Sequence, residues 1–276
     1  MRWLELTSPA TGVRLHVRRV IDPPAPPVLL LHGLGVGGSI WQAFARRLLP
    51  DLAAVAPDLR GHDQSDAPPT GYMPVDYASD LIELITAENW FEPPVRVVGH
   101  SLGALVALAL ADLRPDLVRW LVLLDPALDP DLTSPEIASV SRLRHAPPGE
   151  LEPYLLERNP GGGPLLARSL ARLFRAASDA AFEALRTRDA VPGGGMAADA
   201  LERTPRVQQP CLVIQADPAR GGLLGDAAAA ALVQRLPNGQ LKKIAGASHA
   251  LHASHPADVA RAIRDFYSSV PGSDSR

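Results

Sequence analysis

The pentapeptide from Gly99 to Gly103, Gly-His-Ser-Leu-Gly, places a serine between two glycines. A short apolar, β-branched run from Val95 precedes it, and an apolar stretch that predicts a helix continues to about Arg114. A tight turn between a strand and a helix lifts a serine hydroxyl above the sheet edge, beside the positive end of the helix. Ser101 is therefore a candidate nucleophile. The alternative is a serine that only caps the helix in a glycine-rich loop.

A serine hydroxyl is a weak nucleophile near neutral pH, and histidine is the base that usually activates it. The chain has eight histidines. We favour His249, which follows the last predicted strand, 240–245, in a Gly-x-x-His loop. His252 has no such glycine before it, and His255 starts the final predicted helix. Ser101 and His249 together predict attack on a carbonyl carbon, with the histidine taking the serine proton.

The serine turn, the upstream segment His32-Gly33-Leu34-Gly35 and the downstream His249 make the chain resemble the α/β-hydrolase superfamily, from about residue 12 to 268. The resemblance is greatest to esterase, enol-lactonase and perhydrolase-like members that carry a helical cap. It implies that the backbone N–H groups of Leu34 and Leu102 form an oxyanion hole. It also implies the chain order nucleophile, acid, histidine.

Two aspartates are candidates for the acid that orients His249. In the family the acid usually follows the strand predicted here at 211–215, in a Gly-x-x-Asp loop. This chain has Gln-Ala-Asp-Pro there instead, so that Asp217 arrives early. Some members place the acid after the preceding strand, where Asp125 stands. We favour Asp217, because it keeps the usual strand and needs only a short adjustment of the loop. Asp226 is expected to cap the next helix.

Two loops upstream of the serine also need an interpretation. The glycine-rich segment 32–38 has no lysine, which a P-loop requires, and Ser39 stands where G-x-G-x-x-G needs its last glycine. We therefore expect His32 to brace this loop.

The segment from Asp58 to Ser65 resembles the family's Asp-x-Arg-Gly-x-Gly-x-Ser loop, with Asp63 in place of a glycine. Because aspartate tolerates positive φ, we expect the turn to form.

The predicted elements alternate between strands and helices after an antiparallel pair at the edge. With the resemblance, this order predicts an α/β-hydrolase fold, with a mostly parallel eight-stranded sheet flanked by helices. The expected strands are 2–7, 13–21, 28–31, 52–56, 95 onwards, 117–124, 210–215 and 240–245. The expected helices are 39–49, 74–88, 102–114, 226–236 and 257–268.

The alternation stops between 127 and 209, in a segment rich in proline, alanine, arginine and leucine. We expect this segment to form a helical cap, or lid, and residues 1–126 and 210–276 to form the core domain. One apolar stripe at helical spacing consists of Leu166, Leu170, Leu173, Phe174 and Ala177. The opposite face carries Arg168, Arg172 and Arg175. These arginines could bind an anionic substrate, but a solvated outer face is the preferred interpretation.

Composition limits the class of protein further. The 276 residues suit one large α/β domain with an insertion, and 46% hydrophobic and 21% charged residues are ordinary for a globular protein. A formal charge of −3 gives no reason to expect nucleic acid or a membrane surface as a partner. The single cysteine, Cys211, allows no internal disulfide and no zinc site. We expect no cofactor or metal. The N-terminus lacks the apolar core of a signal peptide, so we expect a cytoplasmic protein. We expect it to be a monomer or a homodimer.

The resemblance and the candidate residues together predict a serine hydrolase. Its expected substrates are water and a small to medium, mainly apolar carboxylic ester or lactone, cleaved through an acyl-enzyme. Two alternatives stay open. One is hydrolysis of a carbon–carbon bond in a β-diketone-like substrate, which uses the same triad, and the other is a non-enzymatic small-ligand receptor on the same fold. The serine argues against epoxide hydrolase and haloalkane dehalogenase chemistry, for which the resemblance would require an aspartate.

Overall fold

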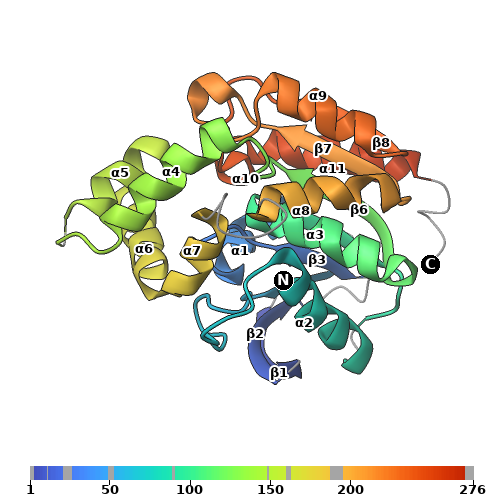
Figure 1. Ribbon diagram of the computed structural model, residues 1–276, viewed down its shortest axis with the longest axis horizontal. Helices are drawn as coiled ribbons and strands as arrows, with labels where there is room; N and C mark the ends of the chain where they lie inside the picture. Colours follow the sequence, from blue (N-terminus) through green and yellow to red (C-terminus); the bar gives the residue numbers. More distant parts are fainter. Residues whose placement is uncertain are drawn as a thin grey trace.

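An eight-stranded sheet forms the centre of the protein in the computed structural model (Figure 1). The structure describes residues 3–10, 12–20, 27–48, 53–88, 91–147, 149–159, 163–186 and 195–270. The strands lie in the order β1-β2-β4-β3-β5-β6-β7-β8. β2 pairs antiparallel with β1 and with β4, and the other neighbours are parallel. The strands are β1 (Trp3–Ala10), β2 (Val13–Val20), β3 (Pro27–Leu31), β4 (Ala53–Pro57), β5 (Val95–His100), β6 (Val118–Leu124), β7 (Cys211–Gln215) and β8 (Gly239–Lys243).

Helices flank this sheet and also fill the long connection between β6 and β7. The helices that flank the sheet are α1 (Trp41–Leu48), α2 (Pro74–Ala87), α3 (Leu102–Leu113), α9 (Asp226–Arg235), the short α10 (Leu251–Ser254) and α11 (Pro256–Ser269). Those of the connection are α4 (Pro130–Leu143), α5 (Leu151–Arg158), α6 (Gly163–Ala176), α7 (Asp179–Arg186) and α8 (Gly195–Arg203). In the part of the chain that is described, no helix has both the length and the apolar character needed to cross a membrane.

The expected α/β-hydrolase fold, a mostly parallel sheet flanked by helices, is confirmed. Each expected strand and helix has a counterpart within a few residues of its predicted ends. Of those ends, residues 2, 21, 49 and 52 lie outside the described residues. The agreement is good because fully apolar strands and strongly periodic helices are the elements that sequence patterns indicate best.

The sheet is buried on both faces, because successive side chains of a strand point to opposite sides. In β3, Leu29 and Leu31 belong to the apolar cluster that includes α2 and α3. Val28 and Leu30 belong to a second cluster, which includes α1 and α11. The sheet is therefore the middle of three layers, with an apolar cluster packed against each of its faces.

The segment between β6 and β7 has two parts (Figure 1). Helices α4 to α7 gather at one side of the molecule, whereas α8 packs against α3 of the core. Asp112, near the end of α3, accepts hydrogen bonds from Arg203 of α8 at 2.7 Å and from Arg206 at 2.6 Å. Helices α4 to α6 share a small apolar cluster of their own, formed by Leu143, Leu151, Leu155, Ala167 and Ala171. The cap boundaries at 127 and 209 stay a prediction.

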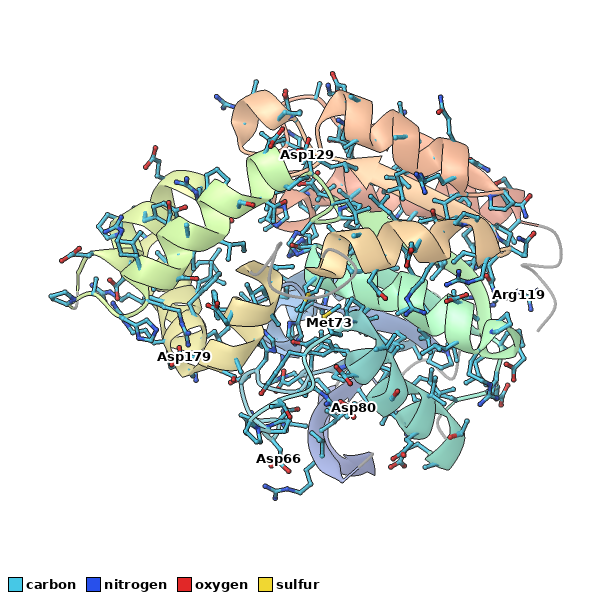
Figure 2. All side chains as sticks on the ribbon, viewed as in Figure 1. Asp66, Met73, Asp80, Arg119, Asp129 and Asp179 are labelled. Carbon is cyan, nitrogen blue, oxygen red and sulfur yellow. The ribbon has the colours of Figure 1, made fainter. Side chains whose placement is uncertain are left out.

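Arg144 holds the corner between α6 and α7. Its buried guanidinium donates to the carbonyl oxygen of Phe174 at 2.7 Å, pairs with Asp179 and lies 4.2 Å from the ring centre of Phe182. Figure 2 labels Asp179 among these helices. The Phe174 ring reaches the core loop, where a Cβ on Gly35 would lie only 2.4 Å from it. Glycine at this position therefore lets the inserted helices approach the sheet closely.

Candidate active site

Ser101 and Asp125 each follow the carboxyl end of a parallel strand, the edge at which α/β proteins bind ligands. Ser101 follows β5 and Asp125 follows the neighbouring β6, whose last residue, Leu124, pairs with His100. The N–H of Ser101 donates to the carbonyl oxygen of Leu124 at 3.0 Å. His249 lies beyond β8 and before α10. The topology thus brings segments far apart in the chain to one edge of the sheet.

The backbone of the serine turn is strained. Ser101 has φ 53° and ψ −115°, a conformation that side chains other than glycine rarely adopt. A Cβ on Gly99 would lie 2.3 Å from the carbonyl oxygen of Gly103, and one on Gly103 would lie 2.4 Å from that of Leu31. Only glycines fit at these two positions, and the serine between them sits on the sharp strand-to-helix turn expected from its sequence.

Asp125 and His249 form a close pair. Oδ2 of Asp125 lies 2.7 Å from Nδ1 of His249. The carboxylate is fully buried and also accepts the backbone N–H of Ala216 at 3.1 Å and that of Leu223 at 2.8 Å. Buried carboxylates need such partners, and here a loop and an imidazole supply them. Asp125, the alternative acid, is therefore the one that contacts His249.

The expectation that Asp217 contacts His249 is wrong. The Asp217 carboxylate accepts the backbone N–H of Ala219 at 3.0 Å and that of Gly246 at 2.9 Å. These two hydrogen bonds hold the pKa of its carboxyl group below the usual value. The physical reason is the path of the loop after β7. This loop turns the backbone N–H groups of Ala216 and Leu223 toward Asp125, which follows β6, and directs its own Asp217 to other backbone N–H groups.

Of the rival histidines, His252 lies close to the pair but is buried among rings. Its ring centre lies 4.8 Å from that of Trp41 and 4.8 Å from that of His100, and burial lowers its pKa to about 3. His255, the other rival, lies beside Ser254 at the start of α11. We did not expect a role for His100, yet its Nε2–H donates to the carbonyl oxygen of His249 at 3.0 Å. The sequence gives no signal for this contact, because His100 occupies a variable position of the serine motif.

A cavity of about 190 Å³ opens beside Ser101 and His249. Its walls are mainly apolar. The core contributes Leu34, Val36, Ile40 and Leu223, and the inserted helices contribute Ile137, Val140, Leu155, Leu166, Leu170 and Phe174. Such a lining favours the apolar part of a small ligand.

The stripe predicted on α6 divides between this cavity and the protein interior. Leu166, Leu170 and Phe174 line the cavity, whereas Leu173 and Ala177 are buried. On the other face, Arg168 and Arg172 are exposed, and Arg175 pairs with Glu152 at 2.8 Å. None of these three arginines lines the cavity, which agrees with the preferred interpretation of a solvated face.

The glycine-rich loop after β3 is braced by His32, as expected. Nδ1–H of His32 donates to the carbonyl oxygen of Gly33 at 2.8 Å, and the N–H of Leu59 donates to Nε2 at 2.9 Å. This assignment of the ring protons follows from the two partners. His32 is fully buried, and burial lowers its pKa, so the ring stays neutral.

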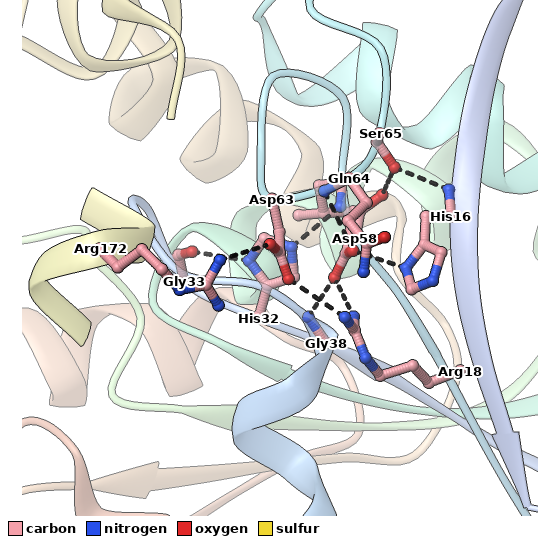
Figure 3. Close-up of polar contacts among 11 residues, drawn as sticks. His16, Arg18, His32, Gly33, Gly38, Asp58, Asp63, Gln64, Ser65 and Arg172 are labelled. Carbon is pink, nitrogen blue, oxygen red and sulfur yellow. Dashed lines mark hydrogen bonds and ion pairs between the residues drawn. The ribbon is translucent and has the colours of Figure 1, made fainter. Parts of the chain in front are cut away.

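The loop after β4 is held by the polar cluster around Asp58 (Figure 3). Asp58 accepts hydrogen bonds from Gly38 N–H at 2.6 Å, from Arg18 at 2.5 Å and from Nδ1 of His16 at 2.8 Å. Burial would raise the pKa of Asp58, but these partners hold it below its usual value. Asp63 has φ 41° and also pairs with Arg18, at 3.1 Å. The turn therefore forms with aspartate at the position of the usual glycine.

The residues expected to supply the oxyanion hole, Leu34 and Leu102, lie beside the cavity and next to Ser101, respectively. Leu34 lines the cavity, and Leu102 is the first residue of α3, where a backbone N–H has no partner inside the helix. Their role in binding an oxyanion stays a prediction. Among the described residues, no group of three histidine, cysteine, aspartate or glutamate side chains is arranged to hold a metal ion.

Known proteins resemble this chain over different shares of its length. It is 30% identical over 247 residues to the pimeloyl-[acyl-carrier protein] methyl ester esterase of Chromobacterium violaceum. This alignment covers 87% of this chain and 93% of that protein. It is also 42% identical over 118 residues to lipase LipV of Mycobacterium tuberculosis. That alignment covers 42% of this chain and 43% of LipV. The alignment thus spans less than half the length of LipV. The structure of an esterase from Exiguobacterium antarcticum superposes with a TM-score of 0.78 at 20% identity, over 96% of this chain and 100% of that chain, and shows the shared fold.

A sequence model described as the alpha/beta hydrolase family matches residues 28–262. The matched range begins at β3 and ends in α11, so it includes the serine turn, the Asp125–His249 pair and the helices inserted between them. The chain belongs to the alpha/beta hydrolase family.

Proposed function

We propose that the protein is a serine hydrolase that cleaves a small to medium, mainly apolar carboxylic ester or lactone. In this proposal Ser101 is the nucleophile, His249 the general base and acid, and Asp125 the group that orients the histidine. The observation that carries it is the 2.7 Å contact between Nδ1 of His249 and Asp125, beside the cavity that Ser101 lines. With Nδ1 engaged by the carboxylate, Nε2 is the nitrogen free to accept the serine proton.

The reaction would proceed in two halves. The Ser101 oxygen bonds to the carbonyl carbon while its proton passes to His249, and the resulting oxyanion accepts hydrogen bonds from the N–H groups of Leu34 and Leu102. The carbon–oxygen bond to the alcohol then breaks, and the alcohol leaves with the proton from His249. Water next gives a proton to His249 and bonds to the acyl carbon. Collapse of this second intermediate returns the proton to Ser101 and releases the acid.

Substrate size and polarity are proposed from the cavity. A space of about 190 Å³ with leucine, isoleucine, valine and phenylalanine walls suits a short apolar group next to the reacting carbonyl. The name of the relative from Chromobacterium violaceum, a methyl ester esterase, supports ester bonds as the target. We further propose that the segment 127–209 acts as the lid, because its helices supply six of the ten leucine, isoleucine, valine and phenylalanine residues in this wall.

The test is turnover of a panel of esters and lactones by the parent protein, Ser101→Ala and the control Ser79→Ala. Ser79 lies on α2, and within the described residues its hydroxyl bonds to the carbonyl oxygen of Val75 alone. We expect Ser101→Ala to fold normally and to lose turnover by a factor on the order of 10⁶. The control should match the parent. Mass spectrometry should detect an acyl group on Ser101 of the parent protein during turnover.

Three outcomes would overturn the proposal. Near-normal turnover by folded Ser101→Ala would exclude the serine as nucleophile. Cleavage of β-diketones without cleavage of any ester would assign the site to carbon–carbon bond hydrolysis. Saturable binding of esters without turnover would identify a receptor on the same fold.

A further inference from the structure

A second, larger cavity of about 700 Å³ adjoins the one beside Ser101. It opens between the end of α5 and the loop after β7. The two cavities share part of their walls, and the polar side chains that line both are Glu136, Arg158, Asn159, Arg220 and Ser248. We call these five residues the junction. It contrasts with the mainly apolar wall nearer to Ser101.

Several hydrogen-bond donors of the junction have no partner in the described part of the chain. The side chain of Arg220 is exposed and forms no hydrogen bond or ion pair there, although its positive charge helps to lower the pKa of Asp217. Arg158 uses only Nε, which donates to both carboxylate oxygens of Glu136 at 2.9 and 3.0 Å, and this leaves its two Nη groups available. The hydroxyl oxygen of Ser248 is buried without a partner.

Other contacts hold the side chains of Arg158 and Asn159, whereas those of Arg220 hold only its backbone. The Arg158 guanidinium lies 3.7 Å from the ring centre of Tyr154, and its Nε side is held by Glu136. The amide group of Asn159 donates to the carbonyl oxygen of Leu155 at 3.0 Å. Arg220 ends a short 3-10 helix, Pro218–Arg220, whose first turn is capped by Asp217. The junction therefore presents two guanidinium groups and one carboxylate, and that carboxylate is already paired.

Unpaired arginine donors at the wall of a cavity favour an acceptor with negative charge, because charge-assisted hydrogen bonds are about twice as strong as neutral ones. A guanidinium group also matches the planar geometry of a carboxylate, to which it can donate two parallel hydrogen bonds. A buried hydroxyl without a partner costs free energy that a ligand oxygen would recover. All three properties fit one carboxylate at the junction.

We propose that the junction is a carboxylate-binding subsite, in which Arg220 and Arg158 hold a free carboxylate of the substrate while Ser101 attacks an ester carbonyl in the apolar cavity. The proposal rests on the ester hydrolysis proposed above and narrows its substrate class. The substrate is then an ester or lactone with an apolar segment between the scissile bond and an anionic end. Arg220 is a specificity residue, because it contacts the remote end of the substrate.

The experiment compares matched ester pairs that differ only in charge. Monomethyl esters of straight-chain dicarboxylic acids are paired with methyl esters of monocarboxylic acids of the same length. A second series pairs acetate esters of hydroxy acids with alkyl acetates, since either side of the ester could reach the junction. The value of kcat/KM is measured for each member with the parent, Arg220→Gln and a control, Arg168→Gln. Arg168 is exposed on α6 and lines neither cavity.

We expect the parent to favour the charged member at one or more chain lengths. In Arg220→Gln the ratio of kcat/KM for the charged member to that for the neutral member should fall about 10- to 100-fold, as expected for loss of one charge-assisted hydrogen bond. The fall should come mainly from KM. Arg168→Gln should keep the parent ratio.

Failure of the subsite and failure of the proposed function give different results. If the parent cleaves neutral esters but the ratio is the same in Arg220→Gln, the subsite is wrong and ester hydrolysis stands. A parent that prefers neutral members at every length in both series also contradicts the subsite. If the parent cleaves no ester of either kind, the proposed function itself is wrong.

Discussion

Asp125 and His249 stand 124 positions apart in the chain, yet Oδ2 of Asp125 lies 2.7 Å from Nδ1 of His249. The loop after β7 completes this pair with backbone donors only, the N–H groups of Ala216 and Leu223. Asp217, the aspartate of that loop, instead accepts the backbone N–H of Gly246, in the turn after β8. The two acids therefore have separable tasks. One contacts the histidine, and the other supports the loop that carries it.

Replacement of each acid by its amide should separate these tasks. Asp125→Asn is expected to lower kcat by up to about 10⁴-fold, because an amide no longer holds His249 in the working tautomer. Asp217→Asn removes at most one neutral-donor hydrogen bond and should cost about tenfold or less. Steady-state kinetics on one ester, with circular dichroism to check folding, makes the comparison. A larger loss in Asp217→Asn than in Asp125→Asn would contradict the assignment.

The glycines of the serine turn should be intolerant of any side chain. In Gly103→Ala the new Cβ would lie 2.4 Å from the carbonyl oxygen of Leu31. Leu31 belongs to β3, so its backbone cannot move away without distorting the central sheet. We expect a loss of about 3 kcal/mol in the free energy of unfolding. The control is Gly149→Ala, where φ is +100° but no atom lies within 4 Å of the new Cβ. It should cost about 1 to 2 kcal/mol through backbone strain alone. Equal urea midpoints for Gly103→Ala and the parent would refute this expectation.

Local sequence patterns were sufficient for the sheet and for the positions of Ser101 and His249 beside one cavity, because each depends on a few neighbouring residues, and the catalytic roles of both residues stay predictions. The choice between Asp125 and Asp217 was not local. It depends on where the loop after β7 turns its backbone N–H groups, and no side chain marks that turn. The packing of α8 against α3 is likewise not marked by a local pattern, since it includes the contact of Arg203 with Asp112, 91 positions earlier. The role of the segment 127–209 as a lid, and the expected cytoplasmic location, stay predictions.

Substitutions on α6 should change the preference for acyl-chain length if this helix covers the site. Phe174→Ala removes a ring that lines the cavity, and we expect kcat/KM for longer acyl esters to change about tenfold or more relative to acetate esters. Leu165→Ala is the matched control, because Leu165 lies on the same helix with 77% of its surface exposed. It should leave the ratio unchanged. Equal losses of Phe174→Ala at all chain lengths would indicate lower stability instead of altered selectivity.

Two buried histidines should make the folded protein sensitive to acid. Burial lowers the pKa of His252 to about 3 and that of His62 to about 3, whereas a histidine in an unfolded chain titrates near 6.5. Between these values the unfolded chain binds protons that the folded chain does not. Their contribution to the free energy of unfolding is complete above pH 6.5 and is lost as the pH falls toward 3.

Each of these histidines should therefore add a slope of about 1.4 kcal/mol per pH unit to the free energy of unfolding between pH 4 and pH 6. His252→Leu keeps an apolar side chain between Trp41 and Phe44, and should lower the total slope by that amount. His62→Asn should have the same effect, and the double variant about twice the effect, because the two sites share no contact among the described residues. Urea unfolding at a series of pH values measures the slopes. A parent-like slope in both single variants would show that neither ring is kept neutral by burial.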